Sequence, residues 1–210
     1  CSRHTNTMIK GVIFDWGGVL IKQPTPEMWT HCANQLGITT DQYYETYKKW
    51  KHQLQRGDIT TAQYWEKLKE DWGCPIPEDQ LYTEGLLHAW QPFEKMFELV
   101  KNLKKNGYVT GFLSNCEKMC EPLFFEKHMD ELFDVIVFSS SEGTRKPEKK
   151  IYEITLDRMK KHNIPAEQCV FIDNKPKNIV ACEEVGMKGI VFTSPEQTIA
   201  ALKEMDVKVD

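Results

Sequence analysis

The sequence has no apolar run that approaches the roughly 20 residues a membrane-spanning helix needs. It also has little excess charge, because 27 Lys and Arg stand against 31 Asp and Glu, for a net charge of −4. Internal repeats and low-complexity segments are absent. These absences argue against a membrane protein, a repeat protein and a basic nucleic-acid-binding surface. With 40% apolar and 28% charged residues, the composition of the 210-residue chain is that of an ordinary globular protein.

The cysteines lack the pattern of a disulfide framework or a zinc site. There are seven, an odd number with scattered spacing. Cys116 and Cys120 are four residues apart, but no second matching pair or nearby histidine accompanies them. We therefore expect reduced thiols in a cytoplasmic protein. The first eight residues, CSRHTNTM, have no apolar centre, so they predict a loose tail rather than a signal peptide.

Five short apolar runs predict the strands of a buried parallel sheet. They are Gly11 to Phe14, Val109 to Ser114, Val135 to Ser139, Val170 to Asp173 and Gly189 to Phe192. Helical patterns alternate with these runs, and Ser194-Pro195-Glu196-Gln197 is a typical helix start. This alternation predicts an α/β fold with a doubly wound, Rossmann-like parallel sheet.

Residues 25–88 break this alternation. They contain no strand-like run, several helical ones, and nine of the 13 Trp and Tyr residues. We interpret them as a small helical cap inserted after the first strand, with residues 9–24 and 89–210 forming the core. The aromatic rings either form the core of this insert or, in part, face a substrate as a lid.

Polar residues follow the predicted strands at the points where they end. Asp15 comes after the first strand, Ser114 and Asn115 end the second, Lys146 precedes a helix, and Asp173 ends the fourth. The carboxyl ends of parallel strands share one edge of a sheet, so these side chains are expected to meet in one crevice. Two carboxylates that close repel each other unless a divalent cation lies between them, and Mg²⁺ suits such oxygen ligands.

Each of these residues also has an ordinary interpretation. Asp15 could be a helix cap, Ser114 and Asn115 an ordinary turn, and Lys146 a surface lysine. The order and spacing of the four stretches together favour a functional site.

With these motifs, the chain resembles the haloacid dehalogenase (HAD) superfamily of hydrolases over about residues 9 to 205, in the branch with a small helical cap. Two further stretches are similar to the family pattern, Arg56-Gly57-Asp58-Ile59-Thr60 and Lys146-Pro147-Glu148.

The resemblance implies a Mg²⁺-dependent phosphatase that hydrolyses a small-metabolite phosphomonoester, with a sugar phosphate among the candidates, through an aspartyl-phosphate. It implies Asp15 as nucleophile and Lys146 as the second catalytic residue. It further implies that Ser114, Asn115 and Lys146 bind the phosphoryl group. The implied metal ligands are Asp15, the backbone carbonyl of Gly17, and Asp173.

The chain departs from the phosphatase pattern at two positions. Gly17 stands where most family phosphatases carry an acid that serves as general acid/base, and Asn174 stands where a second acid is common. Such a general acid/base contributes about 10²–10⁴ in rate. Two alternatives therefore stay open: a weakly active or inactive member that binds or regulates, and a dehalogenase-type hydrolase that attacks carbon.

Overall fold

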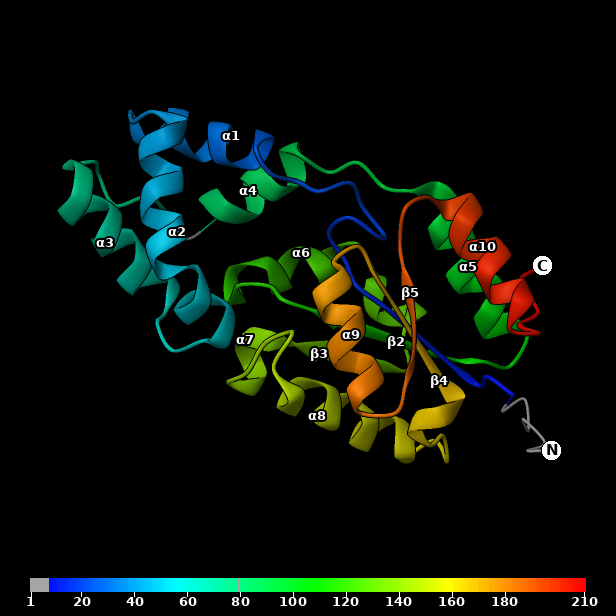
Figure 1. Ribbon diagram of the computed structural model, residues 1–210. Coiled ribbons are helices and arrows are strands. Elements are labelled where there is room, and N and C mark those ends of the chain that lie inside the picture. The colour runs from blue at the N-terminus through cyan, green and yellow to red at the C-terminus, as the bar shows by residue number, and fades with distance from the viewer. Residues whose placement is uncertain (1–7, 79) are drawn as a thin grey trace.

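The computed structural model describes residues 8–78 and 80–210, so the expected N-terminal tail, apart from Met8, lies outside the described residues. Figure 1 shows a sheet covered by helices, with a second group of helices to one side. The part of the chain described here includes no helix that is both long and apolar enough to cross a membrane.

The sheet has five parallel strands in the order β3-β2-β1-β4-β5. Their bounds are β1 Gly11–Phe14, β2 Val109–Ser114, β3 Val135–Phe138, β4 Cys169–Asp173 and β5 Lys188–Val191. Each predicted strand is confirmed to within one residue at either end. From β1, the chain adds β2 and β3 on one side of the sheet and β4 and β5 on the other. Open α/β sheets form their ligand crevice at such a switch point, at the carboxyl ends of the strands.

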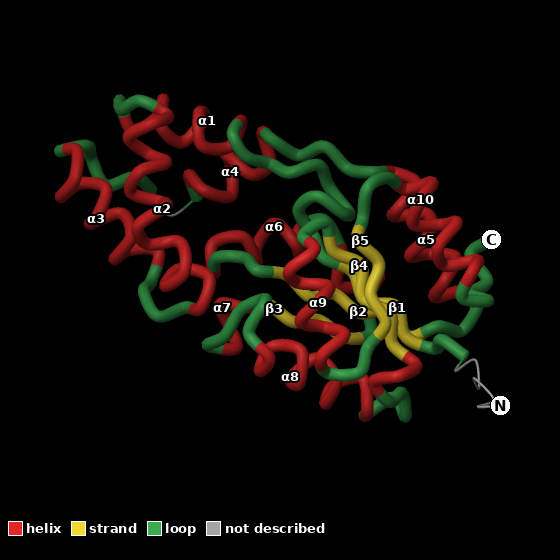
Figure 2. Tube along the Cα trace, viewed as in Figure 1, coloured by secondary structure: helices red, strands yellow, loops and turns green. Residues whose placement is uncertain are grey.

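Both faces of the sheet are buried. Along β1, Val12 and Phe14 belong to one buried cluster and Ile13 to the other, because successive side chains of a strand point to opposite faces. One face is covered by α5 (Glu94–Lys105) and α10 (Pro195–Glu204), the other by α8 (Lys149–Lys160) and α9 (Pro176–Glu184) (Figures 1 and 2). The predicted doubly wound α/β fold is therefore confirmed.

Four helices between β1 and α5 form what we call the helical insert. They are α1 (Glu27–Leu36), α2 (Thr40–Arg56), α3 (Thr61–Trp72) and α4 (Leu81–His88). Capping boxes at Thr39 and Thr60 start α2 and α3, and each of these caps satisfies backbone N–H groups that the first turn leaves free. Glycines in the left-handed region end α1, α2 and α3.

The aromatic rings of the insert lie in two environments. Tyr43, Tyr64 and Trp65 are buried within it as its own core. Trp29, Tyr47 and Tyr82 instead line a pocket toward the sheet.

Two adjacent segments join the insert to the sheet. The backbone N–H of Lys22 donates to the carbonyl of Gln91 at 2.8 Å, and that of Phe93 donates to the carbonyl of Leu20 at 2.9 Å. The chain therefore leaves and re-enters the core side by side, just beyond the end of β1. Shorter helical segments complete the core: Lys118–Cys120, α6 (Glu121–Glu126), Met129–Leu132, α7 (Ser139–Glu142) and Ala166–Gln168.

Candidate active site

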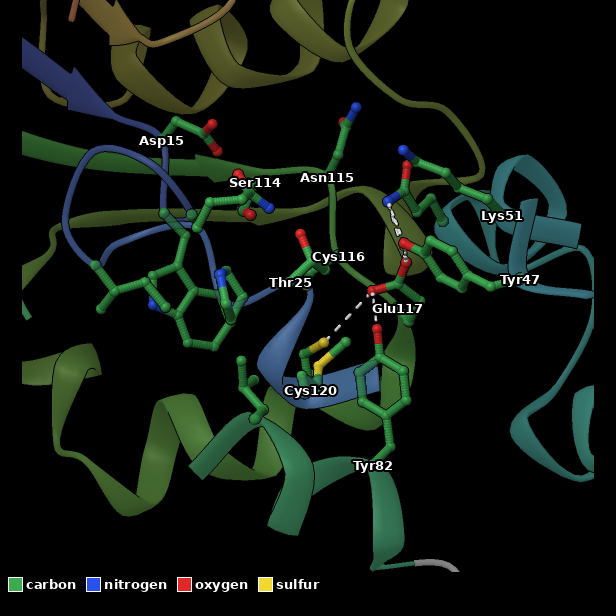
Figure 3. Close-up of a pocket in the computed structure, with 18 of the residues that line it drawn as sticks. Asp15, Thr25, Tyr47, Lys51, Tyr82, Ser114, Asn115, Cys116, Glu117 and Cys120 are labelled. Atoms are coloured by element: carbon green, nitrogen blue, oxygen red, sulfur yellow. Dashed lines mark hydrogen bonds between the residues drawn. The ribbon is translucent and has the colours of Figure 1, made fainter. Parts of the chain in front are cut away.

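A pocket of about 140 Å³ lies between the carboxyl edge of the sheet and the helical insert. Of the predicted side chains, Asp15, Ser114, Asn115 and Lys146 line it, and Asp173 contacts Lys146 behind them; Figure 3 shows Asp15, Ser114 and Asn115. The core supplies Asp15, Gly17, Ser114, Asn115 and Lys146 to its lining, and the insert supplies Met28, Trp29, Tyr47, Lys51, Gln55, Tyr82 and Leu86.

Lys146 is the centre of the polar cluster. Its Nζ lies 2.7 Å from Oδ1 of Asp15 and donates to Oδ2 of Asp173 at 2.7 Å. Its third hydrogen goes to the carbonyl oxygen of Leu113 at 3.0 Å, so all three donors of the ammonium are used. The side chain is 1% exposed, and the interpretation of Lys146 as a surface lysine is therefore wrong.

The charges in this cluster perturb one another. Burial raises the pKa of Asp15 to about 6, against the attraction of Lys146 and with a smaller contribution from the Asp173 carboxylate. Burial acts the same way on Asp173, but the charge of Lys146 and the hydrogen bonds to the carboxylate lower its pKa. For Lys146 burial favours a lower pKa, yet the two carboxylates raise it, so the ammonium stays charged.

The backbone around Lys146 is held by Asn115. The Nδ2 of Asn115 donates to the carbonyl of Lys146 at 2.8 Å, and the N–H of Lys146 donates to Oδ1 of Asn115 at 2.7 Å. The Asn115 side chain therefore positions the lysine, and phosphate binding by this residue stays a prediction. Ser114, which is buried, reaches the same pocket from the end of β2.

Asp173 is oriented by its own loop and by helix α9. Its Oδ1 accepts from the backbone N–H of Lys175 at 2.8 Å, and its Oδ2 accepts from Nδ2 of Asn178 at 2.8 Å. Sequence reasoning missed Asn178, although its place five residues after Asp173, in the first turn of a helix, was a usable signal.

The two glycines after Asp15 have different reasons for being glycine. Gly18 has a φ of 89°, and a Cβ there would collide with the side chain of Asn174. Gly17 has no positive φ, and a Cβ there would meet Pro24 and Gln23 only at ordinary contact distances of 3.5 Å or more. The backbone therefore does not require glycine at position 17.

The donor set beside Asp15 fits a hard divalent cation. Among the described residues no group of three or more His, Cys, Asp and Glu side chains could hold a metal. Two carboxylates, Asp15 and Asp173, are present, and the Oδ1 of Asn174 is buried with no hydrogen-bond partner. Asn174 directly follows Asp173 and its side chain lies against Gly18. The two carboxylates and this amide therefore offer the oxygen ligands that Mg²⁺ prefers.

Glu117 is a buried acid of the pocket that sequence reasoning missed. Its Oε1 accepts from Tyr47 Oη at 2.7 Å and Gln55 Nε2 at 3.0 Å, and its Oε2 accepts from Tyr82 Oη at 3.0 Å (Figure 3). The three donors come from α2 and α4, whereas Glu117 follows β2, so these bonds join the insert to the core. In the sequence Glu117 lies in a polar stretch, Asn115 to Lys118, that resembles an exposed loop.

A second connection joins the two further stretches that resemble the family pattern, Arg56 to Thr60 and Lys146 to Glu148. Arg56, at the end of α2, pairs with Glu148 in the loop that carries Lys146, with Nη2 2.5 Å from Oε1. Thr144 donates to the other oxygen of Glu148 at 3.0 Å. The pair is partly exposed, so its contribution is mainly to orientation.

The family model described as haloacid dehalogenase-like hydrolase matches residues 9–186. A sesquiterpene phosphatase of Aspergillus oryzae is 29% identical over 201 residues, which cover 95% of this chain and 97% of that protein.

Solved structures share the fold. A HAD-like family hydrolase of Porphyromonas gingivalis superimposes with a TM-score of 0.74 at 20% identity, covering 96% of this chain and 99% of that one. A HAD family enzyme of Bacteroides thetaiotaomicron, in complex with magnesium and inorganic phosphate, gives 0.70 at 19% identity, covering 88% and 94%.

Replacing Lys146 tests how far the cluster depends on its cation. Lys146→Met leaves two buried carboxylates without their shared ammonium, and we expect it to lower the free energy of unfolding by about 3–5 kcal/mol. Without Lys146 the pKa of Asp15 should rise further above that of an Asp in the unfolded chain. The stability difference between wild type and variant should therefore grow as the pH rises above about 6, where Asp15 of the wild type is already ionised. Urea unfolding without added metal, at pH 5.5 and pH 8, measures both effects.

The control is Lys150→Met, which removes an exposed lysine at the start of α8. A loss for Lys146→Met no larger than for this control would show that Lys146 does not hold the carboxylates together.

Proposed function

Because the chain belongs to the haloacid dehalogenase-like hydrolase family, we propose that it is a Mg²⁺-dependent phosphatase acting on a small phosphomonoester through an aspartyl-phosphate on Asp15. The observation that carries the proposal is the single ammonium of Lys146, 2.7 Å from both Asp15 and Asp173 at the floor of a pocket. A carboxylate can attack a phosphoryl dianion only where neighbouring charge offsets their repulsion.

In the proposed reaction a carboxylate oxygen of Asp15 attacks phosphorus in line with the ester oxygen. The new P–O bond forms as the bond to the leaving group breaks, and the leaving oxygen takes up a proton from water. Water then hydrolyses the aspartyl-phosphate, which releases phosphate and restores Asp15. The ammonium of Lys146 and the hydroxyl of Ser114 hold the non-bridging oxygens in this scheme.

Magnesium fits beside Asp15. We propose that Asp15, the backbone carbonyl of Gly17 and Asp173 hold the ion, and the unpaired Oδ1 of Asn174 is a further oxygen for it or for its water. When bound, the ion supplies positive charge to the phosphoryl oxygens. The Bacteroides thetaiotaomicron enzyme with the same fold, crystallised with magnesium and phosphate, supports this proposal.

A phosphatase accounts for the site better than either alternative. A dehalogenase releases a halide from carbon and gains little from a second carboxylate and an unpaired amide oxygen next to its nucleophile. A pure binding module has no need of a buried carboxylate that lines the pocket beside an ammonium. The full-length similarity to a phosphatase supports the same choice.

We further propose that the helical insert is a cap and that the substrate's leaving group lies against it. The insert forms one wall of the pocket through Met28, Trp29 and Leu86, which are apolar, and through Tyr47 and Lys51, which are polar. These walls suit a phosphomonoester with a partly apolar organic part, and the sugar phosphate that the sequence analysis named as a candidate stays a prediction.

The function is tested by hydrolysis of an aryl phosphate such as 4-nitrophenyl phosphate. We expect turnover with Mg²⁺, its loss on chelation with EDTA, and its recovery when Mg²⁺ is restored. Asp15→Asn should lower kcat by about 10³-fold or more, because the amide is a poor nucleophile.

Asp157→Asn, at an exposed position on α8, is the matched control and should keep full activity. Circular dichroism of both variants establishes that the fold is intact. Turnover that survives chelation, or an Asp15→Asn variant with more than about a tenth of the normal rate, would contradict the proposal.

The absence of an acid at position 17 predicts a strong preference for good leaving groups. Without a side-chain acid to protonate the leaving oxygen, kcat/KM should fall as the leaving-group pKa rises from aryl to alkyl phosphates. Gly17→Asp should raise kcat/KM for alkyl phosphates by about tenfold or more, because a general acid contributes 10²–10⁴-fold in favourable cases. The backbone accepts a side chain there without strain.

Gly17→Asn is the control, since it has the same shape without the acid. A leaving-group dependence that is already flat in the wild type would mean that another residue delivers the proton.

A cap should respond to ligand. We expect Mg²⁺ with inorganic phosphate to slow amide hydrogen exchange in α1, α2 and α4 by about threefold or more, because closure over the ligand suppresses local opening. Helix α8, which packs on a face of the sheet away from the insert, is the internal reference. Equal protection of the insert with and without ligand would identify it as a rigid structural element.

A further inference from the structure

The ammonium of Lys51 lines the pocket without an acidic partner. Lys51 lies on α2 and is half-buried, with Nζ 5.8 Å from the ring centroid of Tyr47. Within the described ranges no carboxylate approaches it to the 4.0 Å of an ion pair. Other lysines of the same helix differ, because Lys49 pairs with Asp71 at 3.0 Å and Lys48 is exposed.

Further cations gather around Lys51, although the chain as a whole is acidic. Lys175 lines the same pocket from the loop after β4. Arg145 donates its Nε to Oε1 of Gln55, one turn along α2 from Lys51, at 3.1 Å. Burial lowers the pKa of Lys51, and the charges of Lys175, Arg145 and Lys177 lower it further. This part of the pocket therefore has a positive potential that the protein leaves uncompensated.

The nearest acid of the pocket does not neutralise this potential. Glu117 raises the pKa of Lys51, so the two charges interact, but they form no ion pair. The oxygens of Glu117 instead accept hydrogen bonds from Tyr47, Gln55 and Tyr82. The thiol of Cys120 also lies 3.5 Å from Oε2, so these four contacts use the acceptor capacity of the carboxylate and the ammonium of Lys51 keeps its hydrogens for a ligand.

Lys51 and the nucleophile lie at opposite sides of the pocket. Figure 3 shows Asp15 at one side, Lys51 and Tyr47 across from it, and Ser114 and Asn115 between. In the proposed reaction the transferred phosphoryl group lies against Asp15, Ser114 and Lys146. Lys51 therefore faces the part of the substrate that leaves.

We propose that Lys51, together with Lys175, forms a binding site for a second anionic group, so that the substrates are phosphomonoesters whose leaving group carries a carboxylate or a second phosphate. The inference rests on the proposed function. The apolar side chains of Met28, Trp29 and Leu86 contact the body of such a leaving group, and the cations bind its charged end. A half-buried charge-assisted contact of this kind is a strong source of selectivity.

Three aryl phosphates with the same ring and the same leaving oxygen test the proposal. They are 4-propylphenyl phosphate, 3-(4-phosphonooxyphenyl)propanoate and 4-(2-phosphonoethyl)phenyl phosphate, which end in a methyl group, a carboxylate and a phosphonate. The wild type should show a kcat/KM about tenfold higher for an anionic substrate than for the propyl compound. The carboxylate and phosphonate arms distinguish the two kinds of anion.

Lys51→Gln should lower this preference ratio by about tenfold, and Lys51→Arg should restore most of it, because the charge is retained. Lys48→Gln, one turn away on the exposed face of α2, is the matched control and should leave the ratio unchanged. A ratio near one in the wild type, or an unchanged ratio in Lys51→Gln, would overturn the proposal.

Binding measurements separate this inference from the proposed function. Calorimetric titration of the three compounds into Asp15→Asn with Mg²⁺, with and without Lys51→Gln, gives their relative affinities without turnover. If no compound is hydrolysed, the proposed function fails, while tighter binding of the anionic compounds that depends on Lys51 still supports the second site. Hydrolysis of all three with equal affinities overturns the second site alone.

Discussion

The structure of the site depends on one buried ammonium shared by two buried carboxylates. Lys146 can lie 2.7 Å from both Asp15 and Asp173 only if β1 and β4 are adjacent and in register, with Phe14 opposite Ile172. Either carboxylate alone would be costly to bury. The loop before α8 must therefore return over the sheet edge, and the two hydrogen bonds between Asn115 and the backbone of Lys146 hold it there.

The same constraint explains why the insert lies where it does. The loop that carries Lys146 also carries Glu148, which pairs with Arg56 at the end of α2. Glu117, in the loop just after β2, accepts hydrogen bonds from α2 and α4. Because both contacts start from segments beside the Lys146 cluster, the position of the insert is tied to the geometry of that cluster. If the insert acts as the proposed cap, these contacts would couple its movement to the site at Asp15.

The pocket combines two electrostatic environments. Around Asp15 two carboxylates share one ammonium, which leaves an excess of negative charge that suits a divalent cation, whereas around Lys51 positive charge is in excess. In a chain with more acidic than basic residues, that local excess of positive charge is a property of the tertiary arrangement and not of the composition. The backbone at Gly17 would accept any residue. The missing side chain there is therefore not required by the fold, and its effect is on the chemistry of the site.

The sequence by itself determined the sheet, its alternation with helices, the helical insert and the strand-end positions of Asp15, Ser114 and Asp173. These features are encoded locally, in apolar runs, turn residues and caps, and local patterns survive in any tertiary context that buries them. Only the tertiary structure decided that Lys146 is buried, that Asn115 holds its backbone, that Glu117 joins the insert to the core, and that no carboxylate among the described residues pairs with Lys51. Each of these features depends on contacts across the pocket between segments about 30 to 70 residues apart. The local sequence around Glu117 or Lys51 carries no signal that distinguishes a buried side chain from an exposed one.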